Sequence, residues 1–105
     1  MVKSESLHRR YILFKCDVEL DEKSLSDGLI YELLKFFGEY GTSEACFKLI
    51  SYDQKNNRGI IRCHRKYLEK MLGFLAILSK LKDIPIRIVA LSSSGTIKSF
   101  DHFLE

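Results

Sequence analysis

The residues with the clearest chemical potential are basic side chains in one short stretch. Arg62, His64, Arg65 and Lys66 place four potential cations within five positions. Side chains of this type neutralise phosphate groups, so the spacing is typical of a surface that holds a polyanion. Charge alone leaves two alternatives open: these side chains are simply solvated, or Arg62 is the partner in a surface ion pair.

Further candidates for phosphate contact lie on both sides of this stretch. They are Arg9, Arg10, Lys55, Arg58, Gly95, Thr96 and Lys98. Gly95 and Thr96 stand at the start of a predicted helix, where backbone N–H groups can hold a phosphate and Lys98 is nearby. A plain helix cap explains the same residues, and that alternative stays open.

Candidates for catalysis or metal binding are weak in comparison. His64 is a single histidine at the end of a strand, a position where a polar surface residue is more common than a proton donor or a ligand. Cys16, Cys46 and Cys63 form no C-x-x-C pair and fit reduced thiols. No Ser/His/Asp set and no acidic metal loop stands out. We therefore expect no catalytic and no metal-binding residue in this chain.

The length of the chain predicts a single domain, and its charges are distributed unevenly along the sequence. The chain has 105 residues, of which 46% are hydrophobic, and we expect a flexible tail at 1–8 and one domain at 9–105. No membrane span and no signal peptide is recognisable, which indicates a cytoplasmic protein. Residues 17–44 carry eight acidic and two basic side chains, a net −6, whereas the remainder carries 15 basic and six acidic ones, a net +9. A basic remainder of this kind attracts anionic partners.

Hydrophobic spacing predicts the elements that must position these side chains. Alternation over 9–18 predicts a strand with Ile12 and Phe14 on its buried face. A helix follows, from a cap at Ser24 to a stop at Gly41. The later predicted elements are strands at about 45–53 and 59–64 around a polar turn, a long helix ending at about 82, a strand at 84–91 and a short helix at 96–104.

The long helix carries more apolar residues than one buried stripe needs. A second stripe, formed by Tyr67, Phe74, Ile77 and Leu81, predicts an interface with another protein. The alternative is a wide core stripe that meets large packing partners inside the domain.

The order of elements predicts an α+β fold of the ferredoxin-like or RNA-recognition-like type. It is βαββαβ with an additional C-terminal helix and a four-stranded antiparallel sheet. Both long helices should cover one face, and the other face should carry Tyr11, Leu13, Ile60, Val89 and Leu91, covered in part by the terminal helix or a partner. Because Tyr11 is the only ring placed for base stacking, we expect RNA contacts to come from cations on phosphates.

Three segments in this order carry a family resemblance. They are Arg9-Arg10-Tyr11-Ile12-Leu13, Arg58-Gly59-Ile60-Ile61-Arg62-Cys63-His64-Arg65, and Ser94-Gly95-Thr96-Ile97-Lys98 followed by Phe103-Leu104. With them the chain resembles the small RNA-recognition-like protein subunit of archaeal and eukaryotic ribonuclease P and of eukaryotic ribonuclease MRP. The resemblance extends over most of the chain, from about His8 to Leu104.

The resemblance implies an accessory protein in an endonuclease whose chemistry is carried by RNA. In that family the RNA, with bound Mg²⁺, removes the 5′ leader of precursor tRNA, and the protein binds no cofactor itself. The protein stabilises the catalytic domain of the ribonuclease P RNA, pairs with a barrel-type subunit in a two-plus-two heterotetramer, and acts on precursor tRNA indirectly. The residues carried over are Arg58, Arg62, Arg65, Lys66, Gly95, Thr96 and Lys98. The compact chain implies an archaeal source.

Two other function classes stay open on the residues alone. One is a ferredoxin-like regulatory domain that senses a ligand, and the other is a small acylphosphatase-like enzyme. The latter would need a Gly-rich first loop to cradle a phosphate, whereas residues 18–24 contain no glycine. Binding to structured RNA that weakens steeply with salt would separate the RNA-binding hypothesis from both.

Overall fold

The computed structural model describes residues 8–96. Its elements, in chain order, are β1 (Arg9–Cys16), α2 (Glu22–Ala45), β2 (Lys48–Asp53), β3 (Arg58–His64), the 3-10 helix η1 (Arg65–Tyr67), α3 (Leu68–Ile77), β4 (Lys80–Leu81), β5 (Ile84–Pro85) and β6 (Ile88–Ser94). The predicted terminal helix falls, but for Thr96, outside the described residues, and so do residues 1–7 of the predicted tail.

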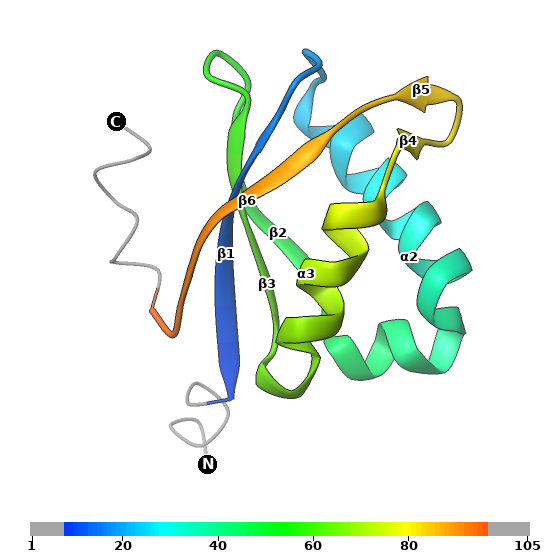
Figure 1. Ribbon diagram of the computed structural model, residues 1–105, viewed down its shortest axis with the longest axis vertical. Coiled ribbons are helices and arrows are strands. Elements are labelled where there is room, and N and C mark those ends of the chain that lie inside the picture. The colour runs from blue at the N-terminus through cyan, green and yellow to red at the C-terminus, as the bar shows by residue number, and fades with distance from the viewer. Residues whose placement is uncertain (1–7, 97–105) are drawn as a thin grey trace.

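The main sheet has the strand order β2-β3-β1-β6, and every neighbouring pair is antiparallel. The helices α2 and α3 lie on the same side of this sheet, which makes two layers (Figure 1). Because β3 separates β1 from β2, the arrangement is the split βαβ pattern of ferredoxin-like domains. The predicted fold class is confirmed.

The core lies between the sheet and the two helices. Alternate residues of β1, including Ile12 and Phe14, point into it and meet Leu29 and Leu33 of α2 and Met71 of α3. The opposite face of the sheet has its own small apolar cluster. Its buried members are Leu13 and Ile60, with Tyr11 and Ile50 packed against them. The predicted alternation of β1 therefore places its residues on the expected faces.

The first helix differs from its predicted limits at both ends. Its N-cap is Asp21, whose carboxylate accepts hydrogen bonds from the Ser24 backbone N–H at 3.1 Å and from the Ser24 hydroxyl at 2.8 Å. The hydrogen bonds from Ser24 lower the pKa of Asp21. At the other end α2 runs past Gly41 to a left-handed Cys46. Among the glycines of α2, the positive φ lies at Gly38, where the helix kinks, and not at Gly41.

The second helix is shorter than predicted. It ends at Ile77, and the next residues form the β4–β5 hairpin instead of further helical turns. Leu81 explains the change, because its side chain packs directly on Gly28: a Cβ at position 28 would lie 3.0 Å from the Leu81 Cβ. Burying Leu81 against α2 outweighs the helical propensity of the segment.

The last strand also starts later than predicted. Pro85 lies in the small hairpin, and β6 begins at Ile88 and runs to Ser94 along one edge of the sheet. Ile86 and Ile88 are buried, whereas Ile84 and Ala90 are exposed. The predicted strand at 84–91 therefore combined two separate elements.

Candidate nucleic-acid interface

Strand register gathers basic side chains on the sheet face opposite the helices. Directly paired residues on neighbouring antiparallel strands point to the same face. Lys15 on β1 pairs with Arg58 on β3, Arg9 pairs with His64, and Arg62 pairs with Lys48 on β2. The same face carries the Leu13–Ile60 cluster, which identifies it as the side away from α2 and α3.

The cations form two groups at opposite ends of this face. Arg58 and Lys15 lie near the β2–β3 turn that also holds Lys55, while Arg62, His64 and their neighbours lie at the other end. At about 3.3 Å per residue along β3, Arg58 lies about 13 Å from Arg62 and about 20 Å from His64. Arg58 and Arg62 are only four positions apart in the sequence, yet they belong to different groups on this face.

These cations make no ion pair in the described part of the chain, although Asp53 on β2 pairs directly with Arg58 across the sheet. Within residues 8–96 the structure shows one ion pair, between Lys35 Nζ and Glu32 Oε1 at 3.9 Å on α2. The alternative that Arg62 is an ion-pair partner finds no support there. Like charges placed directly opposite each other, as Lys15 and Arg58 are, destabilise a sheet. Such an arrangement is expected where an external anion is bound.

At one end of the sheet, hydrogen bonds hold His64 in a fixed orientation. His64 caps η1: its Nδ1 accepts a hydrogen bond from the Lys66 backbone N–H at 3.1 Å. A neutral imidazole that accepts at Nδ1 carries its proton on Nε2. The backbone N–H of Arg65 donates to the carbonyl oxygen of His8 at 2.6 Å. The side chains of Arg65 and Lys66 are exposed beside this corner.

The first and last motifs of the sequence meet at the same end. Tyr11 pairs with Ser94 across β1 and β6. A Cβ at Gly95 would lie 3.3 Å from Arg10 Nη1. Arg10 Nη1 also donates to the carbonyl oxygen of Arg9 at 2.9 Å, and the backbone N–H of Thr96 donates to the Ser94 hydroxyl at 3.1 Å. Lys98 lies outside the described residues.

A cavity of about 350 Å³ opens at this corner. Its described lining residues are His8, Arg9, Cys46, Arg62, Cys63 and His64, none of which is acidic. Sequence reasoning placed His8 in the flexible tail and missed it. The signal that could have found it is its position directly before the basic strand, but its contact with His64 depends on the pairing of β1 with β3.

The buried cysteine of this cavity, Cys63, is not an activated nucleophile. Burial raises the pKa of Cys63 to about 11, although the nearby Arg10 charge opposes the shift. A thiol with such a pKa is protonated near neutral pH, and the thiolate is the reactive form. Within residues 8–96 no three His, Cys, Asp or Glu side chains are grouped as metal ligands would be.

The predicted protein interface on the second helix needs correction. Phe74 and Leu81 are only 2% and 1% exposed, so they belong to the protein's own core. Tyr67 is half-buried, with its ring edge-on to Phe37. Ile77 remains available at 66% exposed. For Phe74 the alternative of a wide core stripe is correct, whereas Leu81 reaches the core from β4 and not from the helix.

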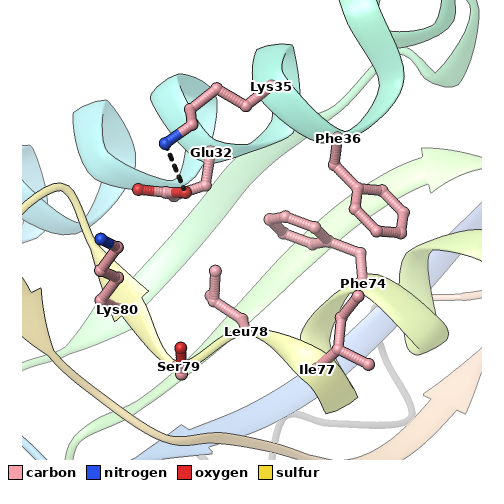
Figure 2. Close-up of a pocket in the computed structure, with 8 residues that line it drawn as sticks. All are labelled: Glu32, Lys35, Phe36, Phe74, Ile77, Leu78, Ser79 and Lys80. Carbon is pink, nitrogen blue, oxygen red and sulfur yellow. Dashed lines mark ion pairs between the residues drawn. The ribbon is translucent and has the colours of Figure 1, made fainter.

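Ile77 borders a groove between α2, α3 and β4. The groove has a volume of about 230 Å³ and is lined by Glu32, Lys35, Phe36, Phe74, Ile77, Leu78, Ser79 and Lys80. Figure 2 shows Phe36 reaching from α2 toward Phe74, with Ile77 on the next turn of α3. Phe36 is exposed and extends the apolar surface around Ile77.

Comparison with known proteins decides what kind of chain carries this surface. The sequence model of the Rpp14/Pop5 family matches residues 10–105. The chain belongs to the Rpp14/Pop5 family. The family resemblance inferred from the three motifs is thereby confirmed.

Individual members of the Rpp14/Pop5 family are similar over most of this chain. Ribonuclease P protein component 2 of Methanocaldococcus jannaschii is 35% identical over 92 residues, which cover 86% of this chain and 67% of that protein. The protein of the same name from Archaeoglobus fulgidus is 35% identical over 92 residues, covering 86% of this chain and 82% of its own.

The same fold is found in a solved structure. A chain in the cryo-EM structure of yeast ribonuclease MRP superposes with a TM-score of 0.70 and 12% sequence identity, covering 86% of this chain and 76% of that chain. At this identity the likeness concerns the fold. No helix in the described part of the chain is long and apolar enough to cross a membrane.

Proposed function

We propose that this Rpp14/Pop5 protein is a subunit of a ribonuclease P ribonucleoprotein that removes the 5′ leader from precursor tRNA. Its role is to bind and stabilise the RNA that carries out the cleavage. The observation that carries the proposal is the row of cations on the helix-free sheet face, where Lys15 opposes Arg58 and Lys48 opposes Arg62 and none of them makes an ion pair within residues 8–96. Membership of the Rpp14/Pop5 family is the reason for proposing ribonuclease P RNA as the RNA that is bound.

The chemistry of this face suits RNA positioning. Cations that contact phosphates fix the orientation of a nucleic acid without reading its sequence, so folded RNA is recognised by shape. Arg58 and Arg62 lie on the face itself, while Arg65 and Lys66 extend it past the end of β3. Catalysis belongs to the RNA and its Mg²⁺, and this chain binds no cofactor in the proposal.

A second surface suits a protein partner. The apolar groove around Ile77 and Phe36 lies on the helical layer, away from the basic face, so RNA and protein can bind together. The partner proposed for it is the barrel-type ribonuclease P subunit, in a two-plus-two heterotetramer. The named relatives support an archaeal source and, with it, a cytoplasmic site of action.

Salt-dependent binding to ribonuclease P RNA tests the proposal. Affinity should fall linearly with salt on a double-logarithmic plot. Replacing Arg58, Arg62 and Arg65 by Ala should make the slope shallower by about one for each phosphate contact removed. The triple variant should also raise the Mg²⁺ concentration that the reconstituted enzyme needs for cleavage of precursor tRNA.

Lysines of the helical layer provide a matched control. Lys23 on α2 and Lys70 on α3 are exposed and lie in the layer opposite the basic face, so replacing both by Ala should leave the slope unchanged. Equal slopes for wild type and the triple arginine variant would contradict the proposed RNA-binding face.

A further inference from the structure

The side chains of His8 and His64 form a parallel ring pair at the end of the basic face. Their ring centroids are 5.6 Å apart and the rings are inclined by 5°. Both residues are held by backbone donors of η1: Arg65 N–H binds the His8 carbonyl oxygen, and Lys66 N–H binds His64 Nδ1. The pair is thus oriented before any ligand arrives, which lowers the entropy lost on binding.

This ring pair differs in exposure from the other ring on the same face of the sheet. The other ring on the same face, Tyr11, is half-buried beside the Leu13–Ile60 cluster. His8 is exposed and is the outer member of the pair, whereas His64 is half-buried. Unpaired RNA bases stack on aromatic side chains, including histidine, and such stacking tolerates any base.

Two guanidinium groups lie within reach of the same ring pair. Arg9 follows His8 in the chain and pairs directly with His64, and Arg62 precedes His64 by two residues on the same face. Both arginines line the cavity of about 350 Å³ that the two histidines also line. Neither makes an ion pair within residues 8–96. The cavity is of the size that encloses a small ligand, roughly 300–1,000 Å³, so it has room for one nucleotide and not for a duplex.

We propose that this corner is a subsite for one unpaired nucleotide of the bound RNA. The base extends the His64–His8 stack on the His8 ring, and the adjoining phosphate lies between Arg9 and Arg62, with His64 Nε2–H available as a further donor. The inference rests on the proposed RNA binding and adds to it a preference for a single-stranded position. Cations elsewhere on the face, such as Lys15 and Arg58, can contact phosphates of paired or unpaired RNA alike.

Fluorescence of a base analogue tests the subsite in the intact protein. The probe is a single-stranded RNA hexanucleotide with one 2-aminopurine, and the comparison probe is an RNA hairpin with the same analogue inside its stem. Stacking on His8 should quench the analogue in the single strand and leave the stem analogue unchanged. His8→Ala should bind the hexanucleotide on the order of tenfold more weakly and without quenching.

Two further variants separate stacking from charge. His8→Phe keeps a flat ring and should retain both affinity and quenching, which also shows that a change at position 8 leaves the fold intact. Arg62→Ala should reduce the salt slope by about one, whereas His8→Ala should leave that slope unchanged because it removes no phosphate contact.

The outcomes distinguish this inference from the function on which it rests. Salt-dependent binding of wild type without quenching, or quenching that persists in His8→Ala, would overturn the stacking subsite and leave RNA binding standing. Absence of binding to either probe and to ribonuclease P RNA at low salt would overturn both.

Discussion

The Glu32 carboxylate accepts a hydrogen bond at 2.8 Å from the backbone N–H of Lys82, although the two residues are 50 positions apart. Glu32 is buried on α2, and Lys82 has a φ of 56° in the turn between β4 and β5. The bond therefore ties the small hairpin to the first helix. The same bond gives an acceptor to the backbone N–H of Lys82, whose backbone is in the left-handed region.

We expect Glu32→Ala to lower the free energy of unfolding by about 1–3 kcal/mol, because it leaves the Lys82 N–H without its acceptor. Glu32→Gln keeps an acceptor oxygen and should lose less. Urea unfolding followed by circular dichroism measures both. Glu39 is exposed on the same helix, and Glu39→Ala should stay within about 0.5 kcal/mol of wild type. Equal losses at positions 32 and 39 would show that the hydrogen bond is unimportant.

Two glycines should respond to alanine in opposite directions. Gly38 has φ 76° and ψ 177° at the kink in α2, a conformation that L residues rarely adopt, while a Cβ there would meet no atom within 4 Å. Gly38→Ala should destabilise the protein by about 1–3 kcal/mol through backbone strain alone.

Gly73 provides the matched control, because it lies inside α3 with open space around its Cβ position. Gly73→Ala should stabilise by up to about 1 kcal/mol through helix propensity. Thermal unfolding of the two variants side by side measures the difference. A stable Gly38→Ala would mean that α2 straightens and that the kink is not required.

The buried thiol of Cys63 should make stability depend on alkaline pH. Its pKa is raised from 9.0 to about 11 by burial, so above 9 the unfolded chain loses a proton that the folded protein keeps. Stability should therefore be unaffected below this range and fall between pH 9 and about 11, by up to about 1.4 kcal/mol per pH unit. The pKa of Tyr52 is raised by burial as well and adds a decrease of the same sign.

Urea unfolding at several alkaline pH values measures this slope, which should be shallower in Cys63→Ala. Alkylation offers an independent check on the folded protein. Cys46 is exposed, whereas Cys63 is buried, so iodoacetamide should modify Cys46 first. Equal modification rates at the two positions would contradict the assigned burial.

The apolar groove predicts different effects at two neighbouring positions of α3. Ile77 is exposed, and Ile77→Glu should keep the fold while weakening association with the proposed partner, the barrel-type subunit. Phe74 is buried, and Phe74→Ala should lower the free energy of unfolding by about 3–5 kcal/mol with or without a partner. Gel filtration of the mixed subunits and unfolding of the isolated chain separate these effects. An Ile77→Glu variant that co-elutes normally would remove Ile77 from the interface.

Parts of the fold were predictable because local physics decides them. Ile12, Phe14 and Cys16 recur at every second position, and this spacing specifies a strand and its buried face, since side chains of a strand alternate. The end of α3 was not predictable in this way. Residues 78–81 have helical spacing, and only the packing of Leu81 on Gly28 draws them into an extended hairpin.

The candidate site shows the same division. Residue types and charge distribution indicated a polyanion surface, and the motifs indicated the family that the comparisons confirm. Which cations act together could not be read from the chain, because Arg58 and Arg62 are close in sequence yet lie near opposite ends of a strand. His8 was missed because its ring meets His64 only through the register of β1 on β3.

The sequence by itself determined the class of fold, the family and the sign of the surface charge, because alternation, motif order and composition are properties of short stretches. The tertiary structure decided that Arg9 and Arg62 share a cavity with two stacked histidines and that Phe74 and Leu81 belong to the core. These relationships join residues distant in the chain. They depend on strand register and on close packing, neither of which is specified until the whole domain has folded.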